Sequence, residues 1–273
     1  MRILFYKITW LLIFTLIYCN TNACSILYYV DPATGKIYVA NNEDYWYDIK
    51  PYIEILPSSK NEYARLWYGW DNFAQGGVNE YGLFFDGAAT PEEPAIDGYS
   101  KPKGNLGDRI ISKCKTVTEA IDLLEQEKIA LTNGHLFLGD KTGNAAVVEW
   151  ANGKRNLVFI KDNVLLATNF LLTDTTKGNY PCQRYNAMEK DISYIKENNE
   201  TVNLKRIGNV AAKAVQLPSE NKENQTAGTL YSTFIDITDM EFVLIYKLDN
   251  SKVTHFDLKE EFNNNKKQKI KLY

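Results

Sequence analysis

Short runs of apolar residues, separated by turn-forming residues, recur along most of the chain. The runs at 25–30 and 36–40 flank the sequence Asp-Pro-Ala-Thr-Gly, which predicts a β-hairpin. Turn-forming residues at 140–144 separate two further runs, so an antiparallel meander is predicted in the middle of the chain. Strands are also predicted at 52–56, 83–85, 135–139, 145–150, 157–160, 164–168, 229–235, 242–246 and 253–258.

Apolar residues at helical spacing mark three other segments. Thr116 and Glu119 form a capping box ahead of an apolar stripe, which predicts that a helix begins there. Segments 182–196 and 207–216 each have one apolar face and are also predicted to be helical, whereas the polar stretch 218–227 is predicted to be a surface loop. Many strands, few helices and no internal repeat predict a single layered α+β domain, which we place at residues 24–258.

The N-terminus has the layout of a secretory signal peptide. Arg2 and Lys7 precede an apolar run at 8–19, and a short polar stretch then ends at the small residue Ala23. We therefore expect residues 1–23 to be removed, which predicts a secreted or periplasmic protein. The apolar run is shorter than the roughly 20 residues of a membrane-spanning helix, so we expect no stable membrane span after cleavage.

Charge and composition exclude some classes of protein. With 31 basic and 34 acidic residues, the chain has no excess of positive charge with which to bind nucleic acid. The polar, Lys- and Asn-rich segment 259–273 is either a surface-binding arm or a solvated tail. With two histidines and no clustered cysteines, neither a metal site nor a cofactor is predicted. Cys114 and Cys182 are either bridged or two buried thiols.

Cleavage after Ala23 leaves Cys24 as the first residue, with a free α-amine beside its thiol. Such an amine titrates at about 7.7–8.0 when unperturbed, so it can accept the proton of the thiol. One residue would then supply both nucleophile and base. Two alternatives are an ordinary strand cysteine and a lipidated membrane anchor. Thr21 argues against lipidation, because that signal usually has an aliphatic residue three positions before the cysteine.

The segment 35–44, together with Cys24 and Ser25, resembles the start of the choloylglycine hydrolase family. This family includes bile salt hydrolases and penicillin V acylases, and the penicillin acyltransferases are similar to it. Further segments that resemble the family lie at 76–83, 166–170, 181–185 and 231–236, over nearly all of the mature chain. The resemblance implies a four-layer αββα sandwich of the N-terminal-nucleophile hydrolase type, with Cys24 at the end of a central strand.

The resemblance also implies roles for three polar residues. Asn42 and Asp44 match the family's Arg-Asn-x-Asp motif, in which the aspartate would orient the α-amine of Cys24. Asn169 matches an asparagine whose side chain would donate to the tetrahedral oxyanion. Asn79 lies in an Asn-Glu-x-Gly-Leu element and would face the substrate. Without the resemblance, a role in a turn is the preferred interpretation of Asp44 and Asn169, and it is an equal alternative for Asn79.

Two departures from the family concern arginines that lie near the nucleophile in bile salt hydrolases. Asn41 and Thr233 stand where those enzymes have arginine, which argues against bile salts as substrates. Aromatic residues are crowded after Asp44, and we expect Trp46, Trp67 and Phe85 to line an apolar slot for an acyl group.

The resulting hypothesis is a secreted amidase that cleaves a linear, non-peptide N-acyl amide, a small molecule, through an acyl-enzyme. The oligomeric state is open, with a homo-oligomer allowed. Two rival functions remain. An acyltransferase would use the same nucleophile with a different acceptor, and a non-catalytic lipoprotein or binding module would be anchored through Cys24.

Overall fold

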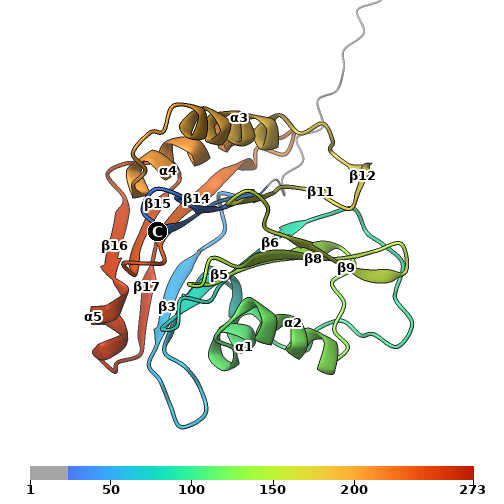
Figure 1. The fold of residues 1–273 in the computed structure, drawn as a ribbon, viewed down its shortest axis with the longest axis horizontal. Coiled ribbons are helices and arrows are strands. Elements are labelled where there is room, and N and C mark those ends of the chain that lie inside the picture. The colour runs from blue at the N-terminus through green and yellow to red at the C-terminus, as the bar shows by residue number, and fades with distance from the viewer. Residues whose placement is uncertain (1–23) are drawn as a thin grey trace, which may run out of the picture.

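Residues 24–273 are described by a computed structural model, in which two antiparallel sheets face each other (Figure 1). The first sheet, sheet A, has the order β10-β1-β2-β14-β15-β16, and β13 pairs with β14. Its strands are β1 (Ser25–Val30), β2 (Ile37–Trp46), β10 (Val164–Ala167), β13 (Ser219–Glu220), β14 (Thr226–Asp236), β15 (Glu241–Tyr246) and β16 (Val253–Asp257). The predicted signal peptide, 1–23, lies outside the described residues.

The second sheet, sheet B, has the order β17-β3-β4-β5-β6-β7-β8-β9. All its neighbouring strands are antiparallel, as the predicted meander requires. Its strands are β3 (Tyr52–Leu56), β4 (Arg65–Trp70), β5 (Phe73–Asn79), β6 (Phe84–Ala89), β7 (Gly134–Gly139), β8 (Ala145–Ala151), β9 (Lys154–Phe159) and β17 (Gln268–Lys271). A small separate sheet contains β11 (Phe170–Leu171) and β12 (Asp174–Gly178).

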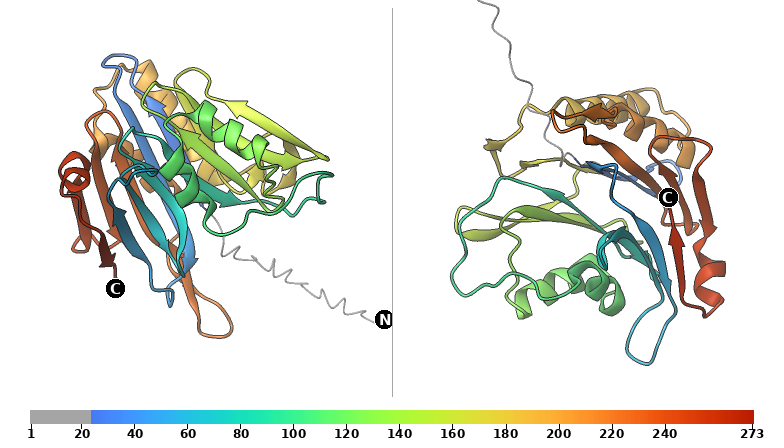
Figure 2. Two further views of the ribbon diagram at one scale, coloured as in Figure 1. Left: turned by 90° about the horizontal axis from the view of Figure 1, so that it is seen from below. Right: turned by 180° about the vertical axis from the view of Figure 1, so that it is seen from behind.

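Helices cover the outer face of each sheet (Figure 2). On sheet A lie α3 (Gln183–Glu197), α4 (Leu204–Ala211) and the short 3₁₀ helix at Ala212–Ala214. On sheet B lie α1 (Leu106–Lys113) and α2 (Val117–Gln126). The order of layers is therefore αββα, which confirms the predicted fold class.

Alternation along the strands divides the core into three apolar layers. In β1, Ile26 and Tyr28 pack between the two sheets, whereas Leu27 and Tyr29 pack under α3 and α4. Sheet B is divided in the same way, with one face toward sheet A and the other under α1 and α2. Both sheets are therefore buried on both faces, and a polar side chain that points into any of these layers leaves water.

The predicted hairpin, meander and three helices are all present. The helix cap at Thr116 forms as expected, because its Oγ1 accepts from the N–H of Glu119 at 3.2 Å. The apolar pattern does not predict β4 and β5, and glycine explains part of that failure. A Cβ atom on Gly77 would lie 2.5 Å from the carbonyl oxygen of Leu66, so close approach of the neighbouring strand requires glycine there.

The segment expected to be a polar tail is folded. Helix α5 (Leu258–Asn263) leads into β17, which pairs with β3 at the edge of sheet B. Ile270 and Leu272 pack against the core between the sheets, whereas Lys269 and Lys271 are exposed. Alternation along an edge strand therefore explains the Lys-rich composition of this segment.

The cysteines of the described chain, Cys24, Cys114 and Cys182, are all unpaired and buried. Cys114 follows α1 below sheet B, and Cys182 directly precedes α3 above sheet A, so the alternative of two buried thiols holds. Among residues 24–273, no helix is both long and apolar enough to cross a membrane.

Candidate active site

Cys24 directly precedes β1, an inner strand of sheet A that lies between the edge strand β10 and β2. Its side chain points into the layer between the sheets, and only 5% of the residue is exposed. Its Sγ–H donates to Oε1 of Glu43 on β2 at 3.5 Å. Burial, followed by the nearby carboxyl groups of Glu43 and Asp44, raises the pKa of the Cys24 thiol well above its ordinary value. The thiol is therefore protonated at neutral pH and needs a base before it can attack.

Asp44 lies near the end of β2 and is fully buried. Its Oδ1 accepts from Thr229 Oγ1 at 2.5 Å, and its Oδ2 accepts from Arg184 Nη1 at 3.3 Å. The pairing of β2 with β14 is irregular between Thr229 and Tyr231, a distortion of the kind that re-aims side chains at functional sites. Burial raises the pKa of Asp44 to about 7, although Thr229 and Arg184 both oppose the shift.

Arg184, in the first turn of α3, joins the other groups. Its Nη1 also donates to the carbonyl oxygen of Cys24 at 3.1 Å, and its Nη2 donates to Oδ1 of Asn169 at 2.9 Å. One guanidinium thus contacts the backbone of the nucleophile, the buried carboxylate and the amide of Asn169. The planar fork of arginine suits such a bridge, whereas a lysine ammonium would hold fewer of these partners.

Asn169 follows β10 and has its amide orientation fixed from both sides. Its Oδ1 accepts from Arg184, while its Nδ2 donates to the carbonyl oxygen of Ala89 at 2.9 Å. An amide nitrogen carries two hydrogens, so one donor of Nδ2 remains after the bond to Ala89. Asn169 can therefore present a neutral donor with a fixed orientation.

The structure brings three predicted residues together, namely Cys24, Asp44 and Asn169. Arg184 lies inside one of the family-like segments, but the sequence assigns it no role. The sequence places it in the first turn of the predicted helix 182–196, directly after the segment that leads into that helix. Only the packing of α3 against sheet A shows that this arginine reaches both Asp44 and Asn169.

A second group of polar side chains lies between the sheets, next to the Cys24 thiol. We call Cys24, Asn41, Glu43, Tyr68, Asp86, Tyr231 and Thr233 the inter-sheet polar cluster. Within it, Thr233 Oγ1 donates to Tyr68 Oη at 3.2 Å, and Tyr68 Oη–H donates to Asp86 Oδ2 at 2.8 Å. Glu43 is linked to Cys24, and all seven residues are buried.

Two carboxyl groups of this cluster share one low-dielectric region. Burial raises the pKa of Asp86 to about 8, although Tyr68 and the N–H of Gly87 stabilise its charged form. Burial, followed by the charge of Asp86, raises the pKa of Glu43 well above its ordinary value. Near neutral pH the two carboxyl groups therefore hold protons that exposed carboxyl groups would have lost.

This protonation predicts a pH-dependent stability. A carboxyl group whose pKa is raised from 3.8 to about 8 on folding binds more protons in the folded than in the unfolded state between those values. Its contribution to stability is complete below about pH 4 and falls until about pH 8, by about 1.4 kcal/mol for each pH unit. We expect Asp86→Asn to reduce this loss, so that the variant gains on the wild type in denaturant unfolding as the pH rises. Equal pH slopes for the two proteins would contradict the expectation.

A profile of the acyl-coenzyme A:6-aminopenicillanic acid acyl-transferase family matches residues 31–250. The chain belongs to this family. The matched region contains Asp44, Asn169 and Arg184, and Cys24 stands shortly before it. A comparison with curated proteins gives no match.

Solved structures with the same architecture include two that are similar over nearly the whole chain. Penicillin V acylase from Agrobacterium tumefaciens has a TM-score of 0.69 and 18% identity, over 91% of this chain and 90% of the other. A variant of conjugated bile acid hydrolase from Clostridium perfringens has a TM-score of 0.69 and 16% identity, over 90% and 96% of the two chains. At these identities the likeness establishes the fold alone. The chain is an αββα sandwich, as are the two solved structures.

Asn79, predicted to face the substrate, is fully buried, and its side chain is hydrogen-bonded within this acyl-transferase family member. Asn79 Nδ2 donates to the carbonyl oxygens of Ile111 and Cys114, both at 2.8 Å, at the end of α1. Its Oδ1 accepts from the N–H groups of Tyr81 and Leu83. The side chain therefore joins a turn to a helix end, which is the structural alternative stated for it.

Trp67 and Phe85 also lie away from Cys24. Both are buried in the layer between sheet B and its helices, whereas Cys24 faces the other side of sheet B. The ring of Phe85 packs so closely under α1 that a Cβ atom on Gly107 would lie 2.1 Å from it. Trp46 is partly exposed and lies two residues after Asp44 on β2, so it shares the face of Asp44. The expected aromatic slot is therefore not assembled from these three residues.

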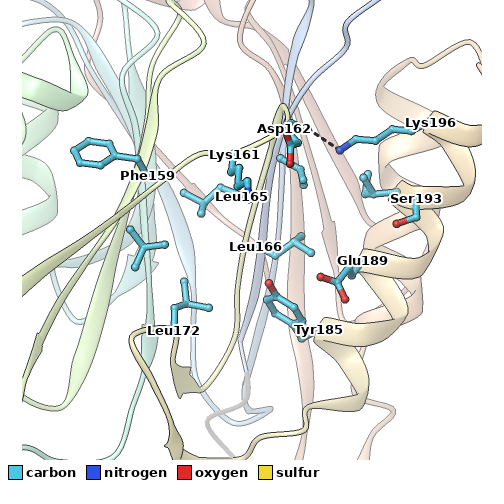
Figure 3. Close-up of a pocket in the computed structure, with 13 residues that line it drawn as sticks. Phe159, Lys161, Asp162, Leu165, Leu166, Leu172, Tyr185, Glu189, Ser193 and Lys196 are labelled. Carbon is cyan, nitrogen blue, oxygen red and sulfur yellow. Dashed lines mark hydrogen bonds between the residues drawn. The ribbon is translucent and has the colours of Figure 1, made fainter.

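Three surface cavities of the described residues lie outside the candidate site, and one of them, of about 550 Å³, is lined by α3, α4 and the 3₁₀ helix. The remaining two are bordered by sheet A. One, of about 440 Å³, lies between α3 and the segment 158–172, and Figure 3 shows Tyr185 and Glu189 projecting from α3 toward it. At its far end Lys196 Nζ donates to the carbonyl oxygen of Asp162 at 2.6 Å. The other, of about 600 Å³, is bounded by α4, β14 and β15. None of the three linings includes Cys24, and residues 24–273 contain no group of His, Cys, Asp or Glu arranged to hold a metal.

Proposed function

We propose that cleavage after Ala23 releases a secreted or periplasmic amidase, in which Cys24 is both the N-terminal residue and the nucleophile. One observation carries the proposal. At the start of β1, the thiol of Cys24 lies beside Glu43, and Arg184 links the Cys24 backbone to Asp44 and Asn169. The fold family and the acylase and bile acid hydrolase neighbours support a reaction at a linear amide.

The first half of the reaction forms an acyl-enzyme. The α-amine of Cys24 takes the thiol proton as sulfur attacks the amide carbonyl carbon, and the second N–H of Asn169 donates to the resulting oxyanion. The protonated amine then gives its proton to the leaving nitrogen as the carbon–nitrogen bond breaks. In the second half, water gives a proton to the α-amine and attacks the thioester, which releases a carboxylic acid and restores the thiol.

Asp44 and Arg184 act as positioning residues in this scheme. An ionised Asp44 accepts a hydrogen bond from the α-amine, and Arg184 favours that ionised form while it holds the strand carbonyl of Cys24 in place. Because the thiol pKa is raised by burial, the amine is needed as a base at neutral pH.

We expect Asn169→Ala to lower kcat by about 100- to 1,000-fold with a smaller change in KM, because it removes the oxyanion donor. Single-turnover kinetics with a chromogenic N-acyl amide would measure the acylation step. Asn186→Ala is a matched control, since Asn186 is an exposed asparagine on α3. A similar loss in both variants, or a pure KM effect for Asn169→Ala, would contradict the proposed role.

We expect Arg184→Lys to move the acidic limb of the pH–rate profile to higher pH. The guanidinium lowers the pKa of Asp44, so its replacement raises that pKa further above about 7. A larger fraction of Asp44 is then protonated at neutral pH, and the amine loses its acceptor. If the profile kept its acidic limb while kcat fell, Arg184 would act through Asn169 alone.

Acyl transfer is the second candidate, and the description of the family favours it. The two reactions share the acyl-enzyme and differ in what attacks it, water or an amine. Product analysis with and without an added amine separates them. The intact mass of the exported protein tests the first requirement of both, a chain that begins at an unmodified Cys24; an added diacylglycerol mass would instead support the lipoprotein alternative.

A further inference from the structure

The inter-sheet polar cluster contains the two positions at which the chain departs from the arginines of bile salt hydrolases. Asn41 on β2 and Thr233 on β14 are direct partners in the sheet, and both face the layer between the sheets. Neither carries a charge. In the same layer lie Glu43 and Asp86, so the ionisable groups beside the nucleophile are acidic rather than basic.

We propose that the inter-sheet polar cluster binds a primary ammonium group, so that the amides cleaved at Cys24 carry a positive charge close to the scissile bond. The proposal rests on the proposed amidase function and adds the class of substrate. A site lined by arginines would favour anionic substrates, whereas the acidic cluster of this chain would favour cationic ones.

Buried acceptors in the cluster are available to such a group. Three oxygen atoms, Asn41 Oδ1, Glu43 Oε2 and Tyr231 Oη, are inaccessible to solvent and have no hydrogen-bond partner within residues 24–273, and the same is true of one donor, Asn41 Nδ2. Glu43 is 4% exposed, and Asn41 and Tyr231 are fully buried. A primary ammonium has three hydrogens to donate and no acceptor, which complements a set of unpaired oxygen atoms. Leaving such atoms unpaired would otherwise cost stability.

Aromatic rings border the same acceptors. The rings of Tyr68 and Tyr231 are 5.6 Å apart and meet edge to face, and each comes from a different sheet. Ring faces attract ammonium groups, more strongly when water is excluded. Two carboxyl groups and two tyrosine rings therefore surround one small region on the inner side of the Cys24 thiol.

The carboxyl groups have no basic partner of their own. In the described part of the chain, no lysine or arginine forms an ion pair with Glu43 or Asp86, whereas Asp44 has Arg184. Two adjacent buried carboxyl groups are costly unless they are protonated or neutralised by a cation. Gly76 lets Asp86 and Tyr68 pack closely against β5, because a Cβ atom there would lie 2.3 Å from Asp86 Oδ2 and 2.4 Å from Tyr68 Oη.

Binding of a cation should release protons, and this gives a test that does not depend on turnover. The side chains facing the two carboxyls are Cys24 before β1, Asn41 and Asp44 on β2, Tyr68 on β4 and Tyr231 on β14, and none of these side chains is cationic. In the mature enzyme the α-ammonium of Cys24 is a further charged group beside them. A bound ammonium lowers the pKa of Glu43 and Asp86, so its affinity should rise as the pH increases from about 6 to 8.

Isosteric substrates test the proposal directly in the mature enzyme. On the acyl side, γ-aminobutyryl anilide is compared with valeryl anilide, in which a methyl group replaces the ammonium, and with the anionic glutaryl anilide. On the amine side, N-valeryl-diaminopropane is compared with N-valeryl-butylamine. We expect the cationic member of one pair to have a kcat/KM about 10- to 100-fold higher than its isostere, and the glutaryl compound to be poorest. The pair that responds identifies the side of the amide.

Variants then assign that preference to the cluster. Glu43→Gln and Asp86→Asn should each reduce the ratio of the two kcat/KM values toward one, whatever they do to the overall rate. Asp236→Asn is the matched control, since Asp236 is a buried aspartate at the far end of β14 that pairs with Lys36 at 3.6 Å. Its ratio should stay at the wild-type value. A wild-type preference for the neutral isosteres, or a ratio unchanged in both cluster variants, would overturn the proposal.

A binding experiment keeps the proposal testable if no amide is cleaved. Calorimetry on mature Cys24→Ala protein would compare γ-aminobutyramide with valeramide, in two buffers that differ in ionisation enthalpy. We expect binding of the cation alone, with proton release, and weaker binding in Asp86→Asn. Binding without turnover would preserve the ammonium site and reject the amidase function. Equal or absent binding of both compounds would overturn the site and would leave the α-ammonium of Cys24 as the cation that the carboxyl groups face.

Discussion

Replacing Cys24 by serine should remove turnover of amide substrates, with a loss in kcat/KM of at least about a thousandfold. Sulfur is the proposed nucleophile, and the hydroxyl of serine is far less nucleophilic with an amine as its base. The change in volume is small, and the Cys24 thiol donates a single long hydrogen bond, to Glu43 at 3.5 Å. Folding should therefore be retained, which circular dichroism and thermal unfolding would check.

The matched control for this variant is Cys114→Ala. Cys114 is also buried and unpaired, but it lies after α1 in the layer below sheet B. The activity of the control should stay within a few fold of wild type, because Cys114 lies in a different layer from Cys24. If Cys24→Ser retained activity within a few fold of wild type, the nucleophile would have to be another group.

A mature chain that keeps one extra residue before Cys24 should lose activity by at least about a hundredfold. The α-nitrogen would then be an amide, whose lone pair is delocalised and cannot accept the thiol proton. The thiol itself would be unchanged, so its titration with a thiol reagent serves as the structural check. Because burial raises the pKa of the Cys24 thiol, little thiolate would form without the amine.

Glu43 makes this second experiment informative in a further way. When ionised, its carboxyl group is an alternative acceptor for the thiol proton, since Oε1 already accepts from Sγ. If the extended chain were fully active and its Glu43→Gln variant were not, the base would be Glu43 and the amine would be dispensable. Full activity in both the extended chain and its Glu43→Gln variant would show that neither the α-amine nor Glu43 is the base.

Much of the fold follows from patterns that the sequence displays locally. The hairpin of β1 and β2 is marked by one turn, and α2 by one capping box, because each depends on residues close together in the chain. The pair of β4 and β5 is not predictable in this way. Its glycines are required by close contact with the neighbouring strand, as Gly77 is by the carbonyl oxygen of Leu66, and local sequence preferences do not reveal such a contact. The Lys-rich end folds against expectation, because apolar residues at alternate positions suffice for an edge strand.

The candidate site is predictable only as far as motif positions allow. Asp44 and Asn169 converge on Cys24 as the resemblance implies, yet the residue that links them, Arg184, comes from a helix whose packing the sequence does not specify. Trp67 and Phe85 are aromatic and belong to the aromatic-rich stretch that follows Asp44, but strand alternation turns both to the far side of sheet B. Which face of a strand meets which layer is a property of the assembled sheets.

The pairing of β2 with β14 bears on when the enzyme can first become active during its synthesis. Ser232 Oγ donates to Asn42 Oδ1 across 190 residues of sequence, and the strands that enclose Cys24 come from both ends of the chain. Contacts of such long separation form late, after most of the chain is available. A partial chain therefore contains the Cys24 thiol but lacks the strands that enclose it. We expect the reaction at Cys24 to begin only after the C-terminal strands have been synthesised.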